Sequence, residues 1–275
     1  MTVVTVLHPG AMGAAVGRQA VSGGATVRWV GAGRGAATRN RATAAGFEEF
    51  TDLPSALEGA DIVLSICPPA FAEDVAGDLA RDVVDYRGVF VEANAITPAR
   101  ARRIAAMLPA ARVVDGGIIG EPPNRPGTTR LYLSGDADGV PELFAGTDLE
   151  VITVSGGIGQ ASALKMAYAS YQKASRVLGA VAHALARDYG VEEHLMREAN
   201  LLRSLPLAEV DQYPGVAAKA WRWEPEMREV AEVMRDSGIP DELALGAAAA
   251  LQRWAPLKDR DDLGTTEVLD LLRDR

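Results

Sequence analysis

A chain of 275 residues can form one or two domains with a buried core, and its 48% apolar and 24% charged residues exclude a disordered or fibrous protein. The net charge of -9 disfavours nucleic acid and anionic membranes as partners. One cysteine and three scattered histidines build neither an internal disulfide nor a zinc site. The N-terminus has no signal-peptide pattern, and no apolar run is long enough to span a bilayer. We therefore expect a cytoplasmic globular protein without a metal.

The first part of the chain alternates strand and helix patterns, which predicts a parallel sheet with crossover helices. The expected strands are 3–7, 26–30, 62–67, 88–92, 113–115, 130–134 and 149–154. The expected helices between them are 14–22, 55–57, 71–79 and 98–108. This pattern is typical of an α/β nucleotide-binding domain.

After Ser155 only helical patterns follow, beginning with one helix of nearly 30 residues. The expected helices are 160–189, 192–203, 215–221, 226–236, 241–254 and 266–272, with a turn at 238–240. We predict a Rossmann domain over 1–155 and an all-α domain over 156–275. Because the helix 160–189 is too long for the others to cover, we also expect a homodimer through it.

The turn after the first strand matches two of the three glycines of the dinucleotide-binding pattern G-x-G-x-x-G. Gly10 and Gly13 hold the positions where backbone approaches a pyrophosphate and where a helix packs on a strand. His8 replaces the first glycine, so the turn must be made differently. An ordinary strand-to-helix turn is the alternative, but the position after an N-terminal strand favours a nucleotide site. Its predicted residues are Pro9, Gly10, Ala11, Met12 and Gly13.

The end of the second strand carries no acidic residue. NAD-binding domains use an Asp or Glu there for the ribose hydroxyls, whereas an arginine can pair with the 2′-phosphate of NADP. The residues present are Gly31, Ala32, Gly33 and Arg34, followed by Arg39 and Arg41. We therefore predict NADP as the cofactor, with Arg34 on its 2′-phosphate. The alternative is that the arginines form a solvated face of the next helix.

Three segments make the chain resemble the β-hydroxyacid dehydrogenase superfamily, which includes 6-phosphogluconate dehydrogenase, 3-hydroxyisobutyrate dehydrogenase and the imine reductases. They are Gly-Ala-Met-Gly at 10–13, Ser-Ile-Cys-Pro-Pro at 65–69 and Val-Glu-Ala-Asn at 91–94. The resemblance covers nearly the whole chain and implies an NADP-binding Rossmann domain, then a helical domain whose long first helix builds a dimer. It implies cofactor contacts from Met12, Cys67, Pro68, Pro69 and Asn94. From the residue alone, Asn94 offers an amide at a strand end, or it caps the helix beginning at Pro98.

The resemblance places a catalytic lysine after a G-x-G stretch at the start of the long helix, which makes Lys165 the candidate. Apolar neighbours on a buried helix disfavour the lysine charge, which suits the amine to proton transfer. The gap from the glycines is two residues longer than in the hydroxyisobutyrate enzymes, and Ala169 replaces an expected Asn. Tyr168 on the neighbouring face can supply the missing polar contact. The alternative is a lysine that extends to solvent from an ordinary helix.

The resembled dehydrogenases hold a substrate carboxylate with a Ser-Gly-Gly segment, and here Ile119 replaces the serine. An apolar side chain there favours a less anionic substrate. The segments at 122–123 and 131–135 look closer to the imine reductases, which commonly lack the lysine. The predicted substrate contacts are Asn94, Gly116, Gly117, Ile118 and Ile119.

Glu226 stands where the relatives have the acidic residue of a Lys-Asp pair, while Pro225 fills the lysine position. We include Glu226 among the substrate contacts. The alternative is a carboxylate that stabilises the first turn of a helix through the helix dipole.

The leading hypothesis is an NADP(H)-dependent oxidoreductase that moves a hydride between the nicotinamide and a small hydroxy, keto or imine substrate. Lys165 is its general acid or base. One alternative is imine-reductase-type activity without the lysine, and another is a catalytically silent NADP-binding sensor or scaffold. The sequence names neither the substrate nor the direction of the reaction.

Overall fold

The computed structural model describes residues 1–188, 190–201, 209–236, 241–260 and 262–273. The chain divides into two compact units, Met1–Lys165 and Met166–Arg275. The division falls inside the long helix α7 (Gln160–Asp188), beyond the boundary predicted at 155/156. Among the described residues, none of the helices is long and apolar enough to span a membrane.

The first unit contains an eight-stranded sheet with the order β3-β2-β1-β4-β5-β6-β7-β8. Every neighbouring pair is parallel except β6 and β7, which are antiparallel. The strands are β1 (Val3–Val6), β2 (Thr26–Val30), β3 (Glu48–Phe50), β4 (Ile62–Ser65), β5 (Val89–Glu92), β6 (Arg112–Gly120), β7 (Thr129–Ser134) and β8 (Leu149–Thr153). The mostly parallel sheet matches the predicted fold class.

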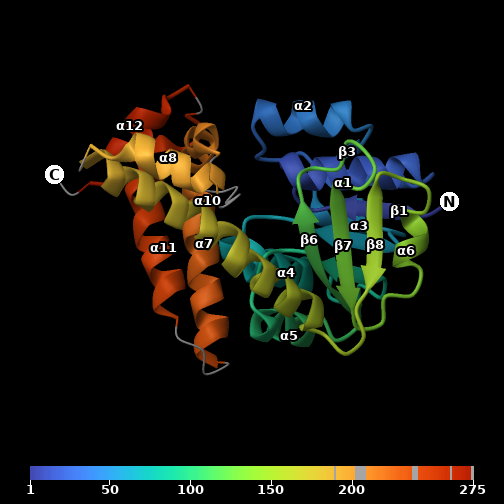
Figure 1. Cartoon of the computed structure of the whole chain (residues 1–275). Coiled ribbons are helices and arrows are strands. Elements are labelled where there is room, and N and C mark those ends of the chain that lie inside the picture. Colours follow the sequence, from blue (N-terminus) through green and yellow to red (C-terminus); the bar gives the residue numbers. More distant parts are fainter. Residues whose placement is uncertain (189, 202–208, 237–240, 261, 274–275) are drawn as a thin grey trace. The chain divides into compact units, whose positions relative to one another are not determined.

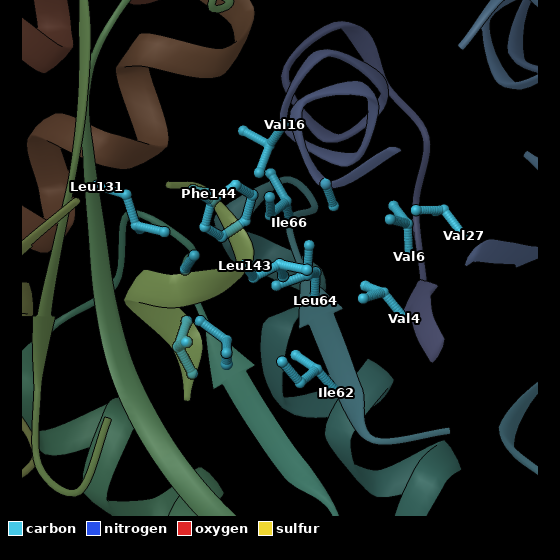
Figure 2. Packing of buried hydrophobic residues seen from close by; sticks show 14 of the residues in the cluster. Val4, Val6, Val16, Val27, Ile62, Leu64, Ile66, Leu131, Leu143 and Phe144 are labelled. Atoms are coloured by element: carbon cyan, nitrogen blue, oxygen red, sulfur yellow. The ribbon is translucent and has the colours of Figure 1, made fainter. Parts of the chain in front are cut away.

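Helices cover both faces of this sheet, with α1 and α2 on one side and α4 and α5 on the other (Figure 1). The helices are α1 (Ala11–Ser22), α2 (Ala36–Ala44), α3 (Leu53–Leu57), α4 (Ala72–Asp82), α5 (Pro98–Met107) and α6 (Val140–Leu143). Alternate side chains of β4 enter different cores, because successive residues of a strand point to opposite faces. Leu64 packs with Val16 and Phe144 in one core, shown in Figure 2, whereas Val63 packs with Leu79 in the other. These two cores fix the level at which the parallel strands end.

The second unit is helical. After α7 come α8 (Glu192–Leu201), α10 (Tyr213–Asp236), α11 (Glu242–Arg253) and α12 (Thr265–Asp270). Trp254 is fully buried, and its indole N–H donates to the carbonyl of Val268 at 2.6 Å, which joins α11 to α12. An all-α region that begins with a long helix is the architecture predicted from the sequence.

Three differences separate the expected elements from the observed ones. Neither β3 nor α6 was expected, because both are short and carry weak apolar patterns, and the helix expected to carry the arginines after the second strand is α2. The helices expected at 215–221 and 226–236 are one helix, α10, with Pro225 inside it. The strand expected at 113–115 continues to Gly120. The turn at 238–240 and the helix ends at 189 and 202–203 lie outside the described residues.

Candidate active site

The candidate site lies at the carboxyl ends of the parallel strands. Strands β1 and β4 are neighbours in the sheet although β2 and β3 intervene in the chain, so the strand order reverses between them. Open α/β sheets bind ligands in the crevice outside the strand ends at such a reversal. The segment 7–13 after β1 and the segment 66–69 after β4 both leave the sheet here.

The glycine turn after β1 begins helix α1 without a capping side chain. Gly10 is the N-cap, and the first turn of the helix contains no acidic residue. A Cβ added at Gly10 would meet nothing within 4 Å, whereas one at Gly13 would collide with the carbonyl oxygen of His8. Arg41 of α2 holds the turn from outside, because its Nε donates to the Pro9 carbonyl at 3.2 Å. An uncapped helix start with free N–H groups attracts anions such as phosphate.

His8 stands where the dinucleotide pattern has its first glycine. Burial and, to a smaller extent, the positive charge of Arg34 lower the pKa of its imidazole to about 4, against an opposing effect of Asp78. The ring is therefore neutral near pH 7. Its buried Nδ1 has no hydrogen-bond partner among the described residues. A buried polar atom without a partner is unusual in a folded protein and marks a place where a ligand can bind.

The turn after β2 presents one uncommitted arginine. The Arg34 amide donates to the Gly31 carbonyl at 3.1 Å, and Gly33 has a φ of +70° that favours glycine. The Arg34 guanidinium makes no hydrogen bond or ion pair with any residue that the structure describes. Arg41, by contrast, is bound to Pro9 and to the hydroxyl of Thr38 at 3.1 Å.

The residues that follow β2 include no carboxylate, as the sequence shows, but one reaches this strand end from another strand. Glu49 of β3 reaches it from the neighbouring strand, and a Cβ at Gly31 would collide with its carboxylate. Arg39 of α2 forms an ion pair with Glu49 and donates to the Gly31 carbonyl at 2.7 Å. A carboxylate from another strand cannot be found by inspecting only the residues that follow β2.

Asn94 joins two strand ends through its side chain. Its carbonyl oxygen accepts the backbone N–H of Cys67, and its amide donates to the hydroxyl of Ser65 at 3.1 Å. The helix beginning at Pro98 is capped by Thr97 instead, whose hydroxyl accepts the Arg100 N–H at 3.2 Å. The capping alternative for Asn94 is therefore excluded, and its side chain fixes the segments after β4 and β5 relative to each other.

The Pro68-Pro69 turn after β4 is held from α5. Arg100, which is buried, donates to the Pro69 carbonyl at 2.9 Å and pairs with Glu73 at 3.3 Å. Burial and the nearby Glu92 carboxylate raise the pKa of the Cys67 thiol to about 12. Cys67 therefore stays a neutral thiol, which suits a packing role better than nucleophilic chemistry.

Glu92 is the last residue of β5 and is 1% exposed. Burial raises its pKa to about 8, hydrogen bonds from Asn94 oppose this shift, and the charge of Asp115 adds to it. Its Oε1 accepts the Asn94 N–H at 3.0 Å, whereas its Oε2 has no hydrogen-bond partner in the described part of the chain. Glu92 therefore supports Asn94 from behind as a largely protonated carboxylic acid at neutral pH.

Asp115 of β6 fixes the start of α7. Its fully buried carboxylate accepts the N–H groups of Gly159 at 2.9 Å and Ser162 at 3.0 Å, and the hydroxyls of Ser162 and Ser134. The Ser134 hydroxyl in turn accepts the Ala161 N–H at 3.0 Å. A carboxylate near a helix N-terminus satisfies unpaired N–H groups and favours the helix dipole. The sheet therefore determines where α7 begins.

Because Asp115 fixes the start of α7, Lys165 lies beside β6. A Cβ added at Gly117 would lie 3.1 Å from the Cβ of Lys165 and 2.8 Å from the Ala161 carbonyl oxygen. One added at Gly116 would lie 3.1 Å from the Cβ of Ala93, the residue before Asn94. The two glycines therefore let α7 and the end of β5 approach the same strand. Lys165 is half-buried and lies beside Gly117 of β6.

The segment 116–119 is strand rather than loop, because it pairs with β7. Ile118 belongs to the buried core on the α1 side of the sheet, and Ile119 is 4% exposed. Sequence reasoning ended this strand early because Gly116 and Gly117 lower strand propensity.

The structure assigns Tyr168 and Glu226 to the second unit. Tyr168, one turn beyond Lys165 on α7, is 41% exposed. Glu226 lies inside α10 and forms a buried ion pair with Lys173 of α7. Because Pro225 does not interrupt the helix, Glu226 is not in a first turn, and the helix-dipole alternative does not hold.

A dinucleotide fits the groups on this edge of the sheet. The uncapped start of α1 suits a pyrophosphate, the free Arg34 guanidinium suits a further phosphate, and the open space at Gly10 lets backbone approach it. The unpartnered Nδ1 of His8 lies on the same turn.

Neither Asp115 nor Glu49 was predicted from the sequence. For Asp115, the available signal in the sequence was its position before two glycines. For Glu49, the sequence offered no signal.

Comparison with known proteins agrees with this architecture. Residues 186–254 match the model of a family described as a domain of unknown function, DUF1932. A curated relative from Methanothermus fervidus, an uncharacterized 28.5 kDa protein in the 7S RNA 5′ region, is 24% identical over 164 residues. That alignment covers 60% of this chain and 63% of the relative, so it spans less than two thirds of that protein.

Two solved structures cover nearly the whole chain. The 3-hydroxyisobutyrate dehydrogenase of Mycobacterium tuberculosis, solved with L-serine, is 21% identical, covers 100% of both chains and has a TM-score of 0.76. A reductive aminase from Aspergillus terreus, in complex with NADPH and ethyl levulinate, is 21% identical, covers 99% of this chain and 100% of that one, and has a TM-score of 0.59. The chain therefore has the fold of the β-hydroxyacid dehydrogenase superfamily, as its sequence resemblance predicts.

Proposed function

We propose that the protein is an NADP(H)-dependent oxidoreductase acting on a small hydroxy, keto or imine substrate. Three features of segments at or beside the carboxyl ends of the strands support this proposal. They are the uncapped start of α1, the Asn94 bridge and the turn of α7 that holds Lys165. The NADPH complex of the similarly folded reductive aminase supports the choice of cofactor.

Each group has a role that its position supports. The N–H groups at the start of α1 bind the pyrophosphate, and Arg34 binds the 2′-phosphate. Asn94 orients the nicotinamide ribose and the substrate through its amide, with the turn at Cys67, Pro68 and Pro69 alongside. When bound, the cofactor supplies or accepts a hydride at the substrate carbon. Lys165 gives a proton to the substrate oxygen or nitrogen during reduction and removes one during oxidation.

Cofactor titration tests the first half of the proposal. Wild-type protein should bind NADPH more tightly than NADH, and Arg34→Ala should weaken NADPH binding by about ten- to a hundredfold. This range corresponds to the loss of a charge-assisted pair worth roughly 1.5–3 kcal/mol. NADH affinity should change little. Equal affinity of the wild type for both cofactors would contradict the assignment of Arg34.

A substrate panel tests the second half. NADPH consumption should be measured with ketones and cyclic imines, and NADP reduction with β-hydroxy acids. Turnover of ketones or hydroxy acids supports the lysine mechanism. Turnover of imines alone supports the second candidate, imine-reductase-type activity, which the buried Ile119 and the exposed Tyr168 favour. NADPH binding without turnover on any panel would favour a sensor or scaffold.

We also propose a homodimer through α7. Leu164, Tyr168 and Tyr171 recur at helical spacing on this helix and are 37%, 41% and 76% exposed. Large apolar side chains gathered on one helix favour a partner that covers them. Light scattering at micromolar concentration should give twice the 29.0 kDa mass of the chain. A monomeric mass would refute the dimer.

A further inference from the structure

A carboxylate lies next to Gly31, and it does not come from the turn that follows β2. Dinucleotide-binding domains use an acidic residue at the end of the second strand to accept the ribose hydroxyls of NAD. Gly31 has no side chain, and the Glu49 carboxylate lies so close that a Cβ at Gly31 would collide with it. A carboxylate therefore stands where an NAD-binding chain places one, although it comes from β3.

The position of Glu49 follows from the pairing of the two strands. In β2 and β3, Trp29 is paired with Glu49 and Val30 with Phe50, and the Gly31 N–H donates to the Phe50 carbonyl at 3.0 Å. Backbone pairing between the two strands continues one residue past β2, so Gly31 still lies beside β3. The Glu49 side chain can then cross to it without any other residue between them.

Arg39 neutralises this carboxylate. Its guanidinium pairs with Glu49 through one nitrogen and donates to the Gly31 carbonyl through another at 2.7 Å. Both side chains are a little over 40% exposed, which leaves them accessible to a ligand. Without Arg39, the Glu49 charge would repel a 2′-phosphate held by Arg34, because like charges at short range destabilise each other.

We propose that Arg39 and Glu49 form the pair that determines specificity for the adenosine ribose. This inference rests on the proposed NADP(H) function and deepens it. With the pair intact, the carboxylate is masked, and a ribose carrying a 2′-phosphate binds against Arg34. With the pair broken, Glu49 accepts the hydroxyls of an unphosphorylated ribose, as the acidic residue of an NAD-binding domain does. Arg34 thus attracts the phosphate, and Arg39 prevents Glu49 from rejecting it.

A double-mutant cycle tests the pair. Dissociation constants for NADPH and NADH are measured by fluorescence titration for the wild type, Arg39→Ala, Glu49→Gln and the double variant. Arg39→Ala should lower the preference for NADPH by about tenfold or more, which is about 1.4 kcal/mol. It should do so by weakening NADPH and strengthening NADH. Glu49→Gln should keep or raise the preference, and the double variant should return to within about threefold of Glu49→Gln.

Two controls keep the test decisive. Arg112→Ala breaks another surface ion pair, with Asp136 at 3.1 Å, at the opposite ends of the strands, and should leave the preference unchanged. Thermal unfolding of each variant checks that the fold is retained. A loss of preference in the double variant equal to that in Arg39→Ala would show that Arg39 contacts the phosphate itself, which overturns the masking role. An equal loss in Glu49→Gln alone would overturn it too.

Failure of the proposed function gives a different result. If the wild type bound neither cofactor, the NADP(H) proposal would fall, and the role of the pair would fall with it. If the wild type bound NADPH tightly and Arg39→Ala kept the full preference, only the role of the pair would be overturned.

Discussion

Two buried carboxylates, Asp115 in the first unit and Glu226 in the second, are stabilised in opposite ways. Within the described part of the chain, Asp115 accepts hydrogen bonds from neutral groups alone, two backbone N–H groups and two hydroxyls. Glu226 is paired with a cation, Lys173, whose ammonium also lies 5.6 Å from the centre of the Trp223 ring. Backbone donors have fixed positions, so they fix the geometry of the element that carries them. Two long side chains can meet over a range of helix separations.

The contrast separates a carboxylate that positions the start of a helix from an ion pair that holds two helices together. Asp115 determines where α7 starts and therefore where Lys165 lies, whereas the Lys173–Glu226 pair holds α7 against α10 within the helical unit. Changes around Asp115 should alter chemistry as well as stability, and changes to the ion pair should alter stability first.

Lys165→Met should lower turnover by roughly 10²–10⁴-fold, because it removes the proton donor but keeps most of the side-chain length. NADPH affinity and thermal stability should stay close to wild type. Steady-state kinetics on the best substrate of the panel, with a parallel NADPH titration, measure both. Tyr168→Phe is the matched variant on the next turn of α7 and should keep most of the activity. If the two effects were reversed, Tyr168 would be the proton donor.

Breaking the Lys173–Glu226 pair should cost about 3–5 kcal/mol of unfolding free energy, because a buried charge is left without its partner. Lys173→Met and Glu226→Gln are the single variants, and urea unfolding measures both. The double variant Lys173→Met with Glu226→Leu should be less destabilised than Lys173→Met alone, since it buries no charge. A double variant that loses the sum of the single effects would show that the pair is not the coupling contact.

Asp115→Asn should cost about 2–4 kcal/mol, because its amide nitrogen would face donors that now bind a carboxylate. Turnover should fall too, since the start of α7 positions Lys165. Ser134→Ala removes a single neutral donor and should cost about 1 kcal/mol with little loss of turnover. Full activity in a destabilised Asp115→Asn protein would show that α7 keeps its start without this carboxylate.

The same contrast explains what the sequence can predict. Gly10 and Gly13 are found from spacing, because helix packing and phosphate approach need glycine at fixed offsets. Lys165 is predicted from the family resemblance, which places a lysine after a G-x-G stretch at the start of a long helix, and its role stays a prediction. Each of these signals is local, and local signals depend only on neighbours along the chain.

The missed features depend on contacts between distant segments. Glu49 lies in a strand of three residues with two glutamates, which has no apolar alternation and pairs with β2. The partner of Glu226 is 53 positions away on α7, so no spacing rule indicates it. Pro225 lies inside α10, which continues from Tyr213 to Asp236 and packs against α11. The polar partners in the site are therefore the part that needed the structure.

Glu92 is a third buried carboxyl, and it has neither the full set of hydrogen bonds of Asp115 nor the ion pair of Glu226. One of its oxygens accepts the Asn94 N–H, and the other has no partner among the described residues. Burial raises its pKa in the folded state to about 8, above the ordinary value of 4.5. Below pH 4.5 the carboxyl is protonated in both states and costs nothing. Between pH 4.5 and 8 the unfolded chain loses this proton while the folded chain keeps it, so stability falls as pH rises.

Glu92→Gln should therefore remove a pH-dependent penalty. The unfolding free energy of the variant minus that of the wild type should rise from pH 5 to pH 8 and then level off, by about 1.4 kcal/mol for each pKa unit of difference. Urea unfolding at several pH values measures this difference and cancels the contributions of all other groups. Glu48→Gln, which changes an exposed carboxylate on β3, is the control variant. A flat difference for Glu92→Gln would mean that the carboxyl is ionised in the folded protein, and that the Asn94 and Ser65 hydrogen bonds compensate its burial.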